Sequence, residues 1–232
     1  MHSHTSPSAP ESIGAPPLAA GGRRHLHFGL GPRLACLAGT ASLALGWLGM
    51  SMAEPDRFGL TPDSSAQSVI EVVTQHADAL HTAASLLAAA AALALVFVGA
   101  VWSLLKPYGE LSAAVAVAGA ATLSLLWLAN AAQLIAFSSF AEYSNGEAAR
   151  MLLTGSWDIG TLFLVAFLVM ALAAACASLP MVVRAVGVFV AGGCAMGLLP
   201  GFGFGYAAMW LAVIWFMLAT VALAFAPGRR VR

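Results

Sequence analysis

Four polar residues stand inside or at the edges of long apolar stretches: His81, Asn130, Gln133 and Asp158. Together they could bind a cation or a proton-linked ligand, with Asp158 as the ionisable centre, the two amides orienting the ligand and His81 responding to pH. Asn130 and Gln133 are three residues apart in "LWLANAAQLIAF", which places them on one face of a helix. One interpretation of the pattern is therefore a ligand-binding site where three helices meet.

A structural role explains the same residues. Ser156 suits the N-cap of a helix, and the helix dipole stabilises a carboxylate such as Asp158 in the first turn. Asn130 and Gln133 can hold neighbouring helices together within a membrane. We favour this interpretation because Asp158 would lie at the membrane boundary, where a charge escapes most of the energetic cost of burial.

Six apolar runs must position these residues, at 34–52, 83–105, 111–137, 159–179, 181–199 and 206–225. Each is close to the about 20 residues that a helix needs to cross a bilayer, and none alternates like a barrel strand. The chain is 60% hydrophobic and only 9% charged, whereas soluble domains are roughly 25% charged. The predicted fold is all-α, a polytopic transmembrane helix bundle with six spans.

The distribution of Lys and Arg predicts the orientation of the spans, because short cytoplasmic loops collect these residues. With the amino terminus inside, only Arg57 and Arg150 of the 10 Lys and Arg residues fall outside. Both termini are therefore predicted to be cytoplasmic, in a multi-pass protein of the plasma (inner) membrane. The run at 34–52 also resembles a secretory signal, but it exceeds the usual 7 to 15 residue signal core, so we expect a retained helix.

The domain organisation follows from these runs. We expect a disordered cytoplasmic tail at 1–32, a six-helix transmembrane domain at 33–226 and a basic cytoplasmic tail at 227–232. Outer helical segments are expected at about 63–82 and 144–156, the second as a short helix or an extension of the fourth span. In the first, Ser64 and Gln67 form a capping-box pattern. One helix face would then carry Glu71, Thr74, Asp78 and His81.

Neither catalytic nor cofactor chemistry is indicated by the sequence. No nucleophile, phosphate-binding or dinucleotide-binding motif is present, so we do not expect an enzyme, a cofactor or a metal. Cys36, Cys176 and Cys194 fall in apolar stretches without metal-ligand spacing. The charges balance, at 10 of each sign, and no basic stripe suggests a nucleic acid. "GCAMG" at 193–197 is a GxxxG pattern that lets helices approach closely.

The stretch "NGEAARMLLTGSWDIGTLFLVAFLVMALAAACASLP", followed by "VVRAVGVFVAGGCAMGLL", resembles a set of small bacterial six-helix integral membrane proteins of unknown function. In these proteins a short outer helix leads through a Leu-Trp-Asp-like turn into the fourth span. Trp157 and Asp158 match that turn, whereas Ser156 stands at the Leu position. The resemblance implies the fold and the location, and it implies no activity.

Two functions remain open. The first is a non-enzymatic membrane module that supports, senses or binds a partner through its outer segments. Its partners would be the lipid bilayer and either another membrane protein or a second copy of the chain. The second is a small transporter or permease-like protein with an outer-leaflet polar site around Asn130, Gln133 and Asp158. The sequence favours the first because it shows no inverted repeat, broken span or deep charge pair.

Overall fold

The computed structural model describes residues 30–61, 63–156, 159–177, 181–199 and 205–225, and this part of the chain is all-helical, as predicted. The predicted tails fall outside the described residues, except that residues 30–32 already belong to the first helix. The helices are α1 (Leu30–Met52), η1 (Pro55–Phe58), α2 (Ala66–Gln75), α3 (Ala77–Leu105), η2 (Lys106–Tyr108), α4 (Glu110–Glu142), α5 (Gly146–Ser156), α6 (Ile159–Cys176), α7 (Met181–Gly197) and α8 (Gly205–Phe225).

Three of these helices, α1, α3 and α4, are long and apolar enough to cross a membrane. Helices α6, α7 and α8 are apolar as well, but their described apolar segments are shorter. Alanine, the strongest helix former, fills much of α3, which ends at Leu105, two residues before Pro107. The apolar runs therefore predict where the long helices lie.

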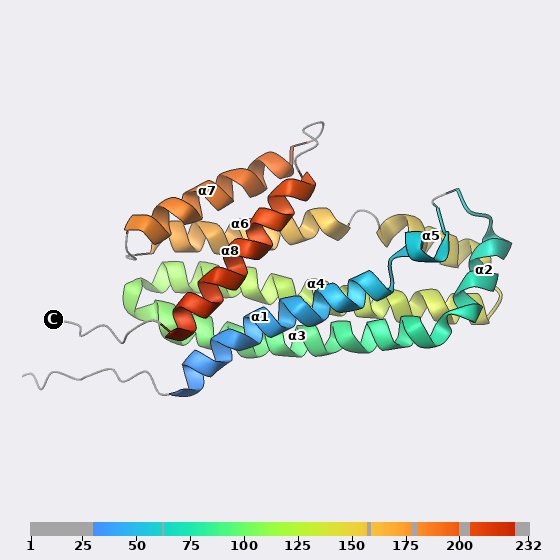
Figure 1. Ribbon diagram of the computed structural model, residues 1–232, viewed down its shortest axis with the longest axis horizontal. Helices are drawn as coiled ribbons and strands as arrows, with labels where there is room; N and C mark the ends of the chain where they lie inside the picture. Colours follow the sequence, from blue (N-terminus) through green and yellow to red (C-terminus); the bar gives the residue numbers. More distant parts are fainter. Residues whose placement is uncertain (1–29, 62, 157–158, 178–180, 200–204, 226–232) are drawn as a thin grey trace, which may run out of the picture. The chain divides into compact units, whose positions relative to one another are not determined.

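The long helices pack in a defined order around a main apolar core (Figure 1), and a small separate cluster of Cys36, Ala100, Leu104 and Ala224 joins α1, α3 and α8. Helix α3 lies between α1 and α4, and α6 packs against both α4 and α7. Helix α8 contacts α1, α6 and α7. Two buried serines add polar contacts inside this core: Ser42 of α1 donates to the Ala90 carbonyl at 2.7 Å, and Ser124 of α4 donates to the Ala91 carbonyl at 2.9 Å. Helix α3 is thus held from both sides through adjacent carbonyl groups.

Small residues set how closely the helices approach. A Cβ at Gly46 of α1 would lie 2.4 Å from the Trp127 ring of α4, and one at Gly119 of α4 would lie 3.0 Å from the Ala166 carbonyl of α6. Gly187 plays the same role between α7 and α6. The predicted GxxxG contact is different, because a Cβ at Gly193 would meet only a side-chain carbon of Leu211, at an ordinary 3.5 Å. On α7, the close helix approach is at Gly187.

A second, smaller apolar core joins η1, α2 and α5 to one end of α3 and α4, and we call this group of elements the cap. Figure 1 shows α2 and α5 beside the ends of the two longest helices. Leu134 packs against both cores and so marks their junction. The buried side chains of the cap core are Leu60, Val69, Val73, Leu80, Phe137, Ala141 and Ala149.

The cap differs from the prediction in how its first helix begins and ends. Ser65, rather than Ser64, is the N-cap of α2, and its side chain accepts a hydrogen bond from the Ser68 N–H at 3.2 Å. The helix then stops at Gln75, and α3 begins at Ala77. At the break, the ring of His76 lies 4.7 Å from that of Phe58. The single helix face predicted from Glu71 to His81 is therefore divided between two helices.

Candidate functional site

His81 lies near the start of α3, in the cap, and its side chain is exposed. Its backbone carbonyl accepts a hydrogen bond from the Ser85 hydroxyl at 2.9 Å. Asp78, one turn earlier, is exposed as well, and its carbonyl accepts from Thr82. The imidazole therefore faces solvent at the edge of the cap.

Asn130 is buried in α4, with 9% of its surface exposed. Its side-chain amide donates to the carbonyl of Leu126 at 2.8 Å, one turn earlier in the same helix. Such a bond satisfies the amide N–H within the helix that carries it, which lowers the cost of placing this polar group in an apolar core.

Gln133 reaches further than Asn130. Its side-chain amide donates to the carbonyl of Leu152 in α5, at 2.8 Å. Leu152 itself packs against the apolar core of the cap, and Leu134 beside Gln133 packs against both cores. Gln133 therefore ties the cap to the long helices at their junction. This is a helix-joining contact of the kind that the structural interpretation of the sequence predicts.

Asp158 lies outside the described residues, between the end of α5 and the start of α6. Ser156, predicted as the N-cap of the fourth span, is instead helical and is the last described residue of α5. The outer segment predicted at 144–156 is helical from Gly146 to Ser156, and it is preceded by Ser144 at φ 57° and by Asn145, whose side chain accepts from the Ala148 N–H at 3.3 Å.

Among His81, Asn130 and Gln133, the three predicted site residues that the structure describes, each side chain has different surroundings. Asn130 contacts its own helix, Gln133 contacts α5 and His81 is exposed. Within the described ranges, no three His, Cys, Asp or Glu side chains are grouped so as to hold a metal ion. Cys36, Cys176 and Cys194 are free thiols, the first and last of them buried.

The cap core itself was missed by reasoning from the sequence. Val69 and Val73 are buried at i and i+4 on α2, so the amphipathic pattern of this short helix was the available signal. Their partners, Phe137 of α4 and Ala149 of α5, are distant in sequence. Only the folded arrangement of α2, α4 and α5 brings these side chains together.

The surface of the cap is acidic. All nine charged residues of residues 53–82 and 140–156 are exposed, and seven of them are acidic. The acidic residues are Glu54, Asp56, Asp63, Glu71, Asp78, Glu142 and Glu147, and the basic ones are Arg57 and Arg150. The cap thus has a solvated charged exterior around an apolar interior, in contrast to the apolar exterior of the long helices.

No family model, curated protein or solved structure matches this chain.

Proposed function

We propose that this chain is a multi-pass inner-membrane protein in which α1, α3, α4, α6, α7 and α8 form six spans, with both termini in the cytoplasm. Support comes from the three long apolar helices, the three shorter ones and the sorting of Lys and Arg to one side. The shortest of the six, α7, has 17 residues, at the lower end of the range for a spanning helix. The resemblance to small bacterial six-helix proteins agrees with this proposal.

The lengths of α3 and α4 support an external cap. Helix α4 has 33 residues and is about 50 Å long, whereas the hydrocarbon core is about 30 Å thick. If Glu110 lies at the inner boundary, about 20 Å of α4 projects beyond the outer one. The projecting part includes Phe137 and Ala141, which are buried in the cap core. A charged cap exterior is suited to water rather than lipid.

On this basis the protein is a non-enzymatic membrane module that binds a protein partner through its cap. The single observation that carries this proposal is the separate apolar core of the cap, fixed to the spans by the Gln133–Leu152 hydrogen bond. A folded and anchored external surface is what a binding module needs. The amides of Asn130 and Gln133 are engaged with backbone carbonyls, which favours this function over transport.

Site-specific photo-cross-linking in intact native cells tests the proposal. A photoreactive residue replaces Gln75 of α2 or Glu147 of α5, both exposed on the cap, and Leu95 of α3 serves as the matched control. Leu95 is 61% exposed on a membrane span, where lipid is its expected neighbour. We expect discrete protein adducts from the cap positions and none from Leu95. Absence of adducts at both cap positions, or equal adducts at Leu95, would contradict a cap that binds protein.

A further inference from the structure

Arg184 is the only charged residue in residues 159–226, which contain α6, α7 and α8. It lies in the first turn of α7 and is exposed, and its Nε donates to the carbonyl of Ala175 in the last turn of α6, at 3.1 Å. The carbonyl end of α6 carries partial negative charge and so favours this contact, whereas the amino end of α7 itself disfavours a cation. The other four N–H groups of the guanidinium remain available for an external acceptor, since no carboxylate pairs with Arg184 within the described residues.

The position of Arg184 is fixed by close packing of α7 on α6. Gly187, Ala191 and Cys194 follow it at i+3, i+7 and i+10, and all three are buried. At Gly187 an added Cβ would lie 3.0 Å from the Ala171 carbonyl of α6, so the two backbones nearly touch one turn beyond Arg184. The guanidinium is therefore held at a rigid point, which lowers the entropy lost when it binds an anion.

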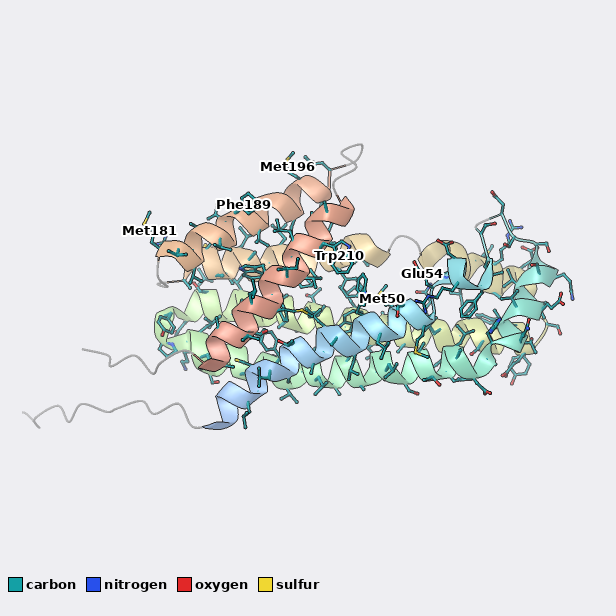
Figure 2. All side chains as sticks on the ribbon, viewed as in Figure 1. Met50, Glu54, Met181, Phe189, Met196 and Trp210 are labelled. Carbon is teal, nitrogen blue, oxygen red and sulfur yellow. The ribbon has the colours of Figure 1, made fainter. Side chains whose placement is uncertain are left out.

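An exposed apolar face of α7 begins beside Arg184. Met181, Phe189 and Met196 are 86%, 67% and 43% exposed and project from the side of α7 away from α6 (Figure 2). Gly192 lies on this face between Phe189 and Met196, and an added Cβ there would meet no atom within 4 Å. The face is thus apolar throughout, with a gap in its side chains at Gly192.

We propose that Arg184 and this face of α7 bind an anionic phospholipid of the cytoplasmic leaflet. The guanidinium donates to the phosphate, for which its planar N–H pairs are well matched, and an acyl chain lies along the apolar face. From Arg184 to Met196 is twelve residues, or about 18 Å of helix, close to half of the about 30 Å hydrocarbon core. The site therefore matches the depth of one leaflet. This inference rests on the proposed topology, which places Arg184 at the inner surface.

Native mass spectrometry of the delipidated full-length protein in detergent tests this site, with phosphatidylglycerol and phosphatidylcholine as probes. We expect preferential retention of phosphatidylglycerol, and Arg184→Gln should reduce that retention roughly five-fold, the effect of one cation near an anionic surface. Arg184→Lys keeps the charge but lacks the planar N–H pairs, so it should retain only part of the preference. The matched control is Lys106→Gln, which removes another exposed cation and should leave retention unchanged.

Two further measurements identify the source of the phosphate and the role of the apolar face. Inorganic phosphate at millimolar concentration should not displace phosphatidylglycerol, whereas displacement would indicate a free-anion site and overturn the proposal. Gly192→Leu fills the gap without changing charge and should weaken retention of both lipids. Equal retention by Arg184→Gln and the wild type would also overturn it. If Arg184→Gln retains lipid as the wild type does but the cap still gives cross-linked protein adducts, only the lipid site is refuted. The proposed function of the cap would then stand, so failure of one proposal can be told from failure of the other.

Discussion

Replacing Gly46 by alanine should destabilise the protein, because the added methyl group would overlap the Trp127 ring. The new Cβ would lie 2.4 Å from Cζ2 and 2.6 Å from Cε2 and Cη2 of that ring, so the ring would have to retreat by about 1 Å to reach ordinary van der Waals contact. It has little room, since Trp127 is 3% exposed and its ring centroid is 4.6 Å from that of Phe163 on α6.

Two opposing free energies decide the effect of Gly46→Ala: the cost of overpacking and the gain in helix propensity. Overpacking a filled core costs typically about 1–3 kcal/mol, and here the clash is with a rigid ring rather than a flexible side chain. Replacing glycine by alanine inside a helix returns up to about 1 kcal/mol through propensity. We therefore expect Gly46→Ala to lower the free energy of unfolding by about 1–2 kcal/mol.

The assay is equilibrium unfolding in mixed detergent micelles, followed by far-ultraviolet circular dichroism. Gly99→Ala is the matched control, because Gly99 is inside α3 and an added Cβ there would meet no atom within 4 Å. That control should be neutral or slightly stabilised. Combining Gly46→Ala with Trp127→Phe should cost less than the sum of the two single changes, since the smaller ring makes room. Equal stability of Gly46→Ala and Gly99→Ala would refute the contact between α1 and α4.

The other predictions concern the cap and the polar contacts of α3. Gly146→Ala would place a Cβ 2.6 Å from the Ala66 carbonyl, so hydrogen exchange should accelerate in α2 and α5 but not in the centre of α3. Gln133→Ala should accelerate exchange in α5 by removing a bond worth roughly 1 kcal/mol, whereas Gln67→Ala on the exposed side of α2 should not. Ser42→Ala and Ser124→Ala should each lower the free energy of unfolding by about 0.6 kcal/mol, and by no more than about 1.7 kcal/mol.

Distinct results would contradict each of these predictions. Unchanged exchange in Gly146→Ala would mean that α5 does not begin against α2. If hydrogen exchange in α5 were the same in the Gln133→Ala and Gln67→Ala variants, Gln133 would not hold the cap to the long helices. Serine variants as stable as the wild type in the micelle assay would show that the hydroxyl bonds to α3 add nothing to its packing.

Reasoning from the sequence located the long helices well, because their apolar runs are a direct consequence of burial in a core or in lipid. The run at 83–105 ends where α3 ends, at Leu105, because the charged Lys106 ends the apolar run and Pro107 opposes continuation of the helix. The predicted start of this run, at residue 83, is six residues after the observed start of α3 at Ala77. Residues 77–82 are helical although polar in part, because Leu80 is buried in the cap core, which is a tertiary contact that periodicity does not reveal.

The helix break in the cap and the hydrogen-bond partners of the candidate site could not be predicted from the sequence. The spacing from Glu71 to His81 fits one helix as well as two, so it cannot reveal the break at His76, where Phe58 packs against the imidazole. Likewise, helical periodicity places Asn130 and Gln133 on one face, but it does not identify the groups that accept hydrogen bonds from their amides. The acceptor of Gln133 is a carbonyl 19 residues away on α5, and its position depends on how that helix packs.

The side of the membrane on which the cap lies is the central claim, and cysteine labelling tests it most directly. In a variant whose three native cysteines are replaced by alanine, a single cysteine is introduced either in the cap, as Ser68→Cys, or next to η2, as Glu110→Cys. Both positions are exposed. We predict that a membrane-impermeant maleimide modifies the Ser68→Cys protein in intact spheroplasts, and the Glu110→Cys protein only after permeabilisation. The reverse pattern, or equal labelling of both proteins in intact spheroplasts, would contradict the account.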